Sequence, residues 1–329
     1  MKLIVTIDTE EDDWGRFEAQ GHTVENVCEI PEVQSMFDKY QIRPTYLINY
    51  PVANDSTAIS ILGEILKNNK CEIGAHCHPW NTPPFSENLN EKNSMLCNLP
   101  VDLNYSKIKN LTSLIEDKLM IRPVSFRSGR WGFNQDVANC LIDLGYKVDT
   151  SITSYTDWRP FYGPDFSKIG VEPFYYVNQD LIAENASLLE IPASVGYKSW
   201  NFELQNTLFR FSRLNRLKKL RLLGLLDKLG LVKRIVLSPE LSTAEEMIQL
   251  TNALSRRGAE FINLYFHSPT LRIGATKYVR NKVDKDRFLN SLERYFQFTN
   301  KSGIQSITLS ETVDQVQHPV DSKYQLNFC

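Results

Sequence analysis

Residues 72–80 read EIGAHCHPW, a short run with the character of a strand that Pro79 ends. Residues two apart in a strand point to the same face, so His76 and His78 should lie side by side with Cys77 turned away. Two imidazoles at the end of one strand supply half of a transition-metal site. They can equally be structural histidines beside a turn, and the motif alone leaves both interpretations open.

The segments around this motif alternate between strands and helices. Residues 2–7 are almost wholly apolar and rich in β-branched residues, as a strand buried on both faces requires, and residues 45–48 form the next strand. Helices are expected over 31–40 and over 56–69, the second of them capped by Ser56. This alternation is typical of a parallel sheet.

The same alternation continues to the end of the chain and indicates one α/β domain over residues 1–329. Further helices are expected over 106–120, 135–144, 243–257 and 284–300, and further strands over 124–127, 146–149, 188–191, 261–266 and 305–309.

Two long segments depart from this pattern. Residues 79–104 form a loop that contains Pro83 and Pro84, and long loops in compact domains are usually functional or mobile. Residues 150–186 are irregular and rich in aromatic residues, whose rings stack well on the apolar faces of sugars. A small secondary core under a long loop would give the same composition, so both interpretations stay open.

Residues 207–234 differ in composition from the rest of the chain, because leucines alternate with lysines and arginines and only Asp227 opposes them. Such a basic amphipathic helix is typical of a contact with an anionic membrane surface. An ordinary helix packed on the domain with a solvated basic face is the alternative. Either way, we expect a helical insertion over residues 198–240.

Overall composition sets limits on location and partners. The formal net charge of -2 gives no basic field for nucleic acid. The six cysteines include no Cys-x-x-Cys pair, which suits free thiols in a reducing compartment. Residues 1–7 are too short an apolar run for a signal peptide or a membrane span. The sequence therefore predicts a cytoplasmic protein, with a peripheral contact at the inner membrane face as an addition.

Polar side chains lie at the ends of five expected strands. They are Asp8 and Glu10, His76 and His78, Arg127, Asp149, and His267. In a parallel α/β barrel these strand ends converge on one rim. A carboxylate with two imidazoles is a metal-ligand set, and a further carboxylate and histidine supply a general base and a general acid.

On these residues the chain resembles, over most of its length, the polysaccharide deacetylases, which are carbohydrate esterase family 4 or NodB-homology proteins. TIDTE at 6–10 is similar to that family's Thr-Phe-Asp-Asp-Gly motif, and HCHPW at 76–80 approaches its His-Ser/Thr-x-x-His motif. RSGR at 127–130 looks like Arg-x-Pro-Tyr, and LYFH at 264–267 looks like Leu-x-His. The whole set is especially similar to a branch linked to lipopolysaccharide biosynthesis.

The resemblance implies a distorted seven-stranded β/α barrel, a divalent metal, and hydrolysis of N-acetyl or O-acetyl groups on glycans. It makes Asp8 the catalytic base, Arg127 the residue that orients it, and His267 the general acid. Asp149 matches the fourth motif, and we expect it to hold the imidazole of His267.

Two positions depart from the family pattern. Thr9 stands where the family has a metal-binding aspartate, and Trp80 stands where it has the second metal-binding histidine. A metal site therefore needs Glu10, or Asp12, as its carboxylate and His78 as its second imidazole. The expected ligands are His76, His78 and Glu10, with Zn²⁺ as the expected metal.

The expected substrate is a carbohydrate or a lipid-linked glycan precursor. Trp80, Arg130, Trp131 and Trp158 are the residues expected to contact it. The principal alternative is a glycan-binding pseudoenzyme that has lost the metal. A glycosidase that uses paired carboxylates among residues 8–12 ranks last, because it lacks a well-separated second carboxylate.

Overall fold

The computed structural model describes residues 1–13, 15–177, 187–198, 201–212 and 233–317. Most of the basic segment expected over 207–234 lies outside these residues. Its membrane contact, and the insertion expected over 198–240, therefore stay predictions.

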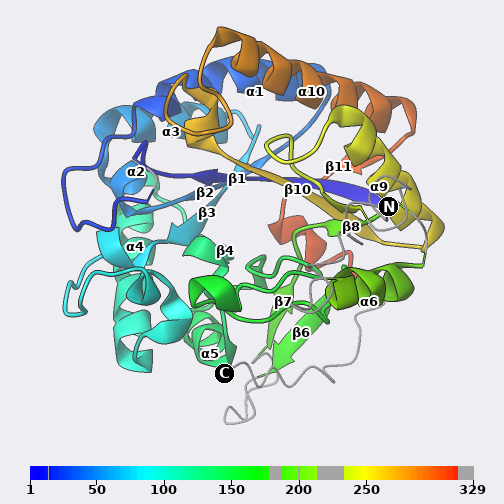
Figure 1. Cartoon of the computed structure of the whole chain (residues 1–329). Helices are drawn as coiled ribbons and strands as arrows, with labels where there is room; N and C mark the ends of the chain where they lie inside the picture. The colour runs from blue at the N-terminus through cyan, green and yellow to red at the C-terminus, as the bar shows by residue number, and fades with distance from the viewer. Residues whose placement is uncertain (14, 178–186, 199–200, 213–232, 318–329) are drawn as a thin grey trace.

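Among the described residues, a nine-stranded sheet curls into a half-barrel at the centre of the molecule (Figure 1). Its strands are β1 (Lys2–Thr9), β2 (Thr45–Ile48), β3 (Glu72–Cys77), β4 (Ser125–Ser128), β5 (Val148–Asp149), β6 (Phe174–Val177), β7 (Ser187–Glu190), β10 (Phe261–His267) and β11 (Gln305–Ser306). They are ordered β10-β1-β2-β3-β4-β5-β7-β6, with β11 also beside β1. Only the pair β6 and β7 is antiparallel in this described sheet.

The predicted α/β barrel fold is confirmed, but the number of strands is higher than the seven expected. One addition is β6, which lies inside the segment expected to be irregular over 150–186. The strand expected over 305–309 is reduced to the short β11. Two further strands, β8 (Val195–Tyr197) and β9 (Arg234–Val236), form a separate antiparallel pair that was not predicted.

Hydrogen bonds outside the strand ladder bridge the open side of the half-barrel. The amide of Ser194, which follows β7, donates to the carbonyl of Asn263 in β10 (3.1 Å), and the amide of Asn263 donates to Ser194 Oγ (2.9 Å). The side chain of Asn263 donates to Thr150 Oγ1 (2.7 Å) and accepts from Thr6 Oγ1 (3.1 Å). These buried bonds fix β10 beside β1 and the end of β5.

Helices surround the outer face of the sheet (Figure 1). They are α1 (Ile30–Lys39), α2 (Tyr50–Asn54), α3 (Ser56–Lys67), α4 (Val101–Leu119), α5 (Gln135–Asp143), α6 (Phe202–Ser212), α9 (Ala244–Arg256) and α10 (Lys282–Lys301). The core lies between these helices and the sheet. Phe37 of α1 and Phe296 of α10, for example, pack edge to face with ring centroids 5.7 Å apart. No helix in the described part of the chain is long and apolar enough to cross a membrane.

Helix starts follow local capping rules, with two departures from expectation. Asp55, not Ser56, is the N-cap of α3, because its carboxylate accepts from the amide of Ala58 (2.8 Å). Helix α4 begins at Val101, directly after Pro100, rather than at Ser106. Placing the caps correctly matters here because α2 and α3 follow directly from the strand beside the site.

Candidate active site

The register of the parallel strands brings the predicted site residues together. Asp8 lies opposite His267 in the pairing of β1 with β10, and His76 lies opposite Arg127 in the pairing of β3 with β4. Their strand ends surround a cleft of 610 Å³. Of the predicted residues, the cleft is lined by Asp8, Glu10, His76, His78, Trp80, Arg130, Trp131, Trp158 and His267.

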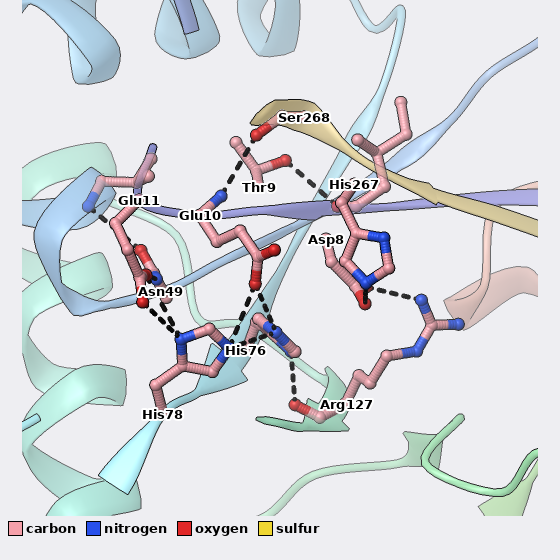
Figure 2. Close-up of polar contacts among 12 residues, drawn as sticks. Asp8, Thr9, Glu10, Glu11, Asn49, His76, His78, Arg127, His267 and Ser268 are labelled. Carbon is pink, nitrogen blue, oxygen red and sulfur yellow. Dashed lines mark hydrogen bonds and ion pairs between the residues drawn. The ribbon is translucent and has the colours of Figure 1, made fainter. Parts of the chain in front are cut away.

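Glu10, His76 and His78 form the candidate metal centre, and Figure 2 shows their side chains pointing at one another. His76 Nε2 and His78 Nε2 are 2.9 Å apart. They lie 3.3 Å and 3.1 Å, respectively, from Glu10 Oε2. Ligand atoms around a tetrahedral zinc ion are about 3.3 Å apart, close to these three separations. All three residues are buried.

The hydrogen bonds of the two imidazoles show that the residues present fit a cation. His76 Nδ1 lies 3.0 Å from the carbonyl oxygen of Arg127, and His78 Nδ1 lies 3.1 Å from the carboxylate of Glu11. Both Nδ1 atoms face acceptors and therefore donate, so in the neutral form of each ring the lone pair lies on Nε2, toward Glu10. Three lone-pair atoms that converge in a buried site attract a positive charge.

The pKa values of His78 and Glu10 also indicate that this site favours a positive charge. Burial would lower the pKa of His78, but Glu11 and Glu10 outweigh it and raise it to about 10. Burial would raise the pKa of Glu10, but the contacts with His76 and His78 hold it well below its usual range. A proton on His78 therefore supplies positive charge at this point of the cleft.

The two positions that depart from the family pattern have other contacts. Thr9 Oγ1 donates to the carbonyl of Ile7 (3.1 Å), so it is used within its own strand. Trp80 stacks on His78 with ring centroids 4.1 Å apart, and its indole N–H donates to Glu11 (3.2 Å). Trp80 is 5% exposed, so it supports the ring of His78 more than it presents a surface to a sugar.

Asp12, the alternative carboxylate, does not belong to the candidate metal centre. Its side chain accepts from the amides of Glu25 and Asn26 (2.8 and 3.0 Å) and from Thr23 Oγ1 (2.8 Å). These bonds hold the loop that follows β1. Glu10 is therefore the carboxylate that the structure brings to the two histidines.

Asp8 is held in place by a buried arginine, as predicted. Arg127 Nη1 donates to Asp8 Oδ1 (2.5 Å), and Nη2 donates to Thr6 Oγ1 (2.7 Å). The guanidinium also lies over the rings of Trp131 and Tyr265, 5.0 and 5.5 Å from their centroids. Arg127 is fully buried and binds Asp8 Oδ1. The other oxygen, Asp8 Oδ2, is therefore the one that faces the cleft.

His267 also lies beside Asp8. Its Nε2 is 3.6 Å from Asp8 Oδ2, the carboxylate oxygen that does not bind Arg127 (Figure 2). Its Nδ1 lies 2.9 Å from the carboxylate of Glu240. Burial would lower the pKa of His267, but Glu240, and then Glu10 and Asp8, raise it to about 9. His267 is therefore an imidazolium at neutral pH, with Nε2 as its donor toward the cleft.

The role expected of Asp149 is wrong. Its carboxylate accepts from the amide and the hydroxyl of Ser151 (2.9 and 2.7 Å). Burial raises the pKa of Asp149 and of its neighbour Glu190, which are close enough to affect each other. This pair does not line the cleft, and the carboxylate at His267 Nδ1 is that of Glu240. Glu240 and not Asp149 therefore holds the imidazole of His267.

Glu240→Gln is expected to lower the pKa of His267. Glutamine keeps the length of the side chain and one acceptor oxygen but removes the charge that contributes most to raising that pKa. The imidazolium is present below the pKa and is lost as the pH rises through it. NMR titration of the ring should show a midpoint near 9 in the wild type and a lower one in the variant.

The matched control is Glu91→Gln, which removes a carboxylate that pairs with Arg130 at the rim of the same cleft. It should leave the His267 midpoint in place. An unchanged midpoint in Glu240→Gln would contradict the assignment of Glu240.

The aromatic wall of the cleft follows β4. Gly129 packs against His78, and a Cβ at this position would lie 2.4 Å from His78 Cδ2. Arg130 and Trp131 then adopt positive φ angles of 54° and 62°, which are uncommon for such residues and cluster at functional sites. Trp131 and Trp158 are nearly parallel, with an interplanar angle of 14°.

Sequence reasoning missed two carboxylates that complete the site. Glu11 was considered only among the paired carboxylates of residues 8–12, and its place beside Glu10 was the one available signal. No sequence pattern indicated Glu240. It follows the basic segment, and only the folding of the chain brings it to His267. Tyr265 and Tyr278 also line the cleft and were not predicted.

Comparisons with known proteins bear on the fold. No protein-family model matches the sequence, and the search of the curated proteins found no match. Among solved structures, a candidate polysaccharide deacetylase from Mycobacterium smegmatis matches with a TM-score of 0.55 and 12% identity. That match covers 97% of this chain and 92% of the other. The chain has the fold of a polysaccharide deacetylase.

Two further structures share this fold. A candidate glycoside hydrolase or deacetylase from Parabacteroides distasonis matches with a TM-score of 0.57 and 12% identity, over 95% of this chain and 70% of the other. A 4-α-glucanotransferase from Thermococcus litoralis matches with a TM-score of 0.55 and 10% identity, over 98% of this chain and 41% of the other. Because these names include different activities, function has to be argued from the site.

Proposed function

We propose that this protein is a metal-dependent hydrolase that removes an acetyl group from an amide or ester on a sugar of a glycan or glycolipid precursor. The observation that carries the proposal is one cleft that holds both the candidate metal centre and the pair Asp8 and His267. The fold shared with a candidate polysaccharide deacetylase agrees with it.

Glu10, His76 and His78 would hold the metal, which in a hydrolase polarises a carbonyl and makes water a better nucleophile. Asp8, held by Arg127, accepts the proton of the attacking water. His267, kept protonated by Glu240, donates a proton to the leaving nitrogen or oxygen. The base and the acid lie 3.6 Å apart, close enough to act on the same reacting group.

The cleft supports a sugar as the substrate. Its volume of 610 Å³ falls in the range of small-molecule sites. Trp131, Trp158 and Phe161 give one wall flat apolar surfaces, on which the faces of a sugar ring can stack. The lipid link of the substrate, the lipopolysaccharide branch and the cytoplasmic location stay predictions.

Protein purified without added metal or chelator is expected to contain about one equivalent of a divalent transition metal, which the three buried ligands would retain. The variant His76→Ala/His78→Ala should contain none. His22→Ala is the matched control, because His22 bonds Asp13 and Glu18 away from the cleft. Elemental analysis measures the content, and acetate release from N-acetylated and O-acetylated precursors measures the activity.

Wild-type protein that holds no metal after reconstitution, and releases no acetate, would contradict the proposal. In that case the cleft would be that of a glycan-binding pseudoenzyme. Binding of glycans without turnover would then be the property to measure.

A further inference from the structure

Glu11 carries a buried carboxylate that the reaction proposed above does not use. It is 2% exposed and follows Glu10 directly at the end of β1. Its two oxygens accept from His78 Nδ1 (3.1 and 3.2 Å), from Trp80 Nε1 (3.2 Å) and from Asn81 Nδ2 (3.0 Å), and also from the side-chain amide of Asn49 (Figure 2). Four donors from two other segments thus converge on one carboxylate.

The surroundings require Glu11 to be an acceptor on both oxygens. Asn49 is the N-cap of α2, and its Oδ1 accepts from the amide of Val52 (3.3 Å). Its amide nitrogen is therefore the atom that faces Glu11. The indole of Trp80 is a donor only. A carboxylate, with two acceptor oxygens, fits this set of donors better than any neutral side chain.

The same contacts determine the direction of His78. The rings of His76 and His78 are inclined at 66°, so His78 is turned relative to its neighbour on the strand. Trp80 covers one face of the His78 ring, and Gly129 lies close to its Cδ2 edge. Glu11 binds the remaining Nδ1 edge and so directs Nε2 at Glu10 and His76.

The charges of the carboxylates around the candidate metal centre add a second argument. Arg127 offsets Asp8, and the imidazolium of His267 offsets Glu240. Glu10 and Glu11 both face imidazoles, and their formal charges sum to -2. A divalent cation neutralises that sum with both imidazoles in the neutral form that ligation requires.

We infer that Glu11 is a positioning residue that makes His78 a metal ligand, and that it supplies half of the negative charge that balances a divalent metal such as Zn²⁺. This inference rests on the proposed metal-dependent function. It also explains how His78, two residues after His76, can serve as the second metal ligand, although the family places its second histidine four residues after the first. The stacked Trp80 and the carboxylate of Glu11 together hold the closer histidine in place.

The test is the affinity of the full chain for Zn²⁺, measured by competition with a chromophoric chelator. Glu11→Gln is expected to weaken binding about 10- to 100-fold, as loss of a group that orients a ligating histidine does. Glu11→Asp keeps the charge, but its shorter side chain withdraws from Nδ1, so it should also weaken binding. It serves as the second variant if Glu11→Gln does not fold, which circular dichroism of the metal-free proteins would show.

Glu91→Gln is the matched control, because it neutralises another carboxylate that lines the cleft, one that pairs with Arg130 and not with an imidazole. It should leave the Zn²⁺ affinity at the wild-type value. If Glu11→Gln and Glu11→Asp also keep that value, or if Glu91→Gln loses as much affinity, the inference is overturned. A wild type that binds no Zn²⁺ would instead overturn the metal centre itself, which separates the two failures.

Discussion

Asp8→Asn is expected to lower kcat for acetate release about 10²- to 10⁴-fold, the usual loss when a general base is removed. Asparagine keeps an oxygen that can accept from Arg127 Nη1, which lies 2.5 Å from Asp8 Oδ1 in the wild type. It cannot take the proton of the attacking water. Steady-state acetate release at saturating substrate measures the loss, and metal content should stay near one equivalent.

Asp12→Asn is the control for this experiment. Asp12 is four residues after Asp8, but its side chain binds backbone amides and does not line the cleft. We expect it to retain turnover. Full activity in Asp8→Asn, or an equal loss in both variants, would show that Asp8 is not the base.

Arg127→Leu is expected to destabilise the fold by about 3–5 kcal/mol, because it leaves the buried carboxylate of Asp8 without its partner. Arg127 is fully buried and also donates to Thr6 and to the carbonyl of Thr150 (2.7 and 3.0 Å). Those acceptors would lose their donors as well. The free energy of unfolding in urea measures the effect.

Arg130→Leu is the matched control, since Arg130 is three residues away and part of its side chain, 22%, is exposed. Its ion pair with Glu91 should contribute less than about 1 kcal/mol. In the double variant Asp8→Asn/Arg127→Leu, the penalty should be smaller than in Arg127→Leu, because the unpaired charge is gone. A similar cost for Arg127→Leu and Arg130→Leu would contradict a buried ion pair at the centre of the site.

The sequence predicted those parts of the fold whose pattern is local. Strand β1 has Leu3, Ile4, Val5 and Ile7 fully buried, and such a run of apolar residues leaves little choice of conformation. Strand β6 was missed although Phe174 and Tyr176 are buried and Tyr175 and Val177 are not. Its alternation is hidden because the exposed positions are also apolar.

In the candidate site, too, the sequence predicted the residues that follow a local pattern and missed those that depend on packing. His76, His78, Arg127 and His267 end strands, and the sequence placed them on one rim because parallel strands share an edge. Glu240 lies outside any strand, and only the packing of the segment before α9 against β10 brings it to His267. Asp149 ends a strand as expected, yet its position in the sheet sets it beside Glu190 rather than His267. A local sequence pattern predicts which residues end strands and therefore lie on the rim. It does not predict how far apart two of those residues are.

The pairing of β1 with β10 has a consequence for the synthesis of the protein. The amide of Glu10 donates to Ser268 Oγ (3.2 Å) across a sequence separation of 258 residues, and Asp8 pairs with His267 in the same ladder. Strand β1 can therefore pair with β2 early in synthesis, but its other edge has to wait for β10. Under the proposed function, a chain that lacks β10 would carry the base without the acid. Such a chain would be inactive toward acetylated sugars until β10 is in place.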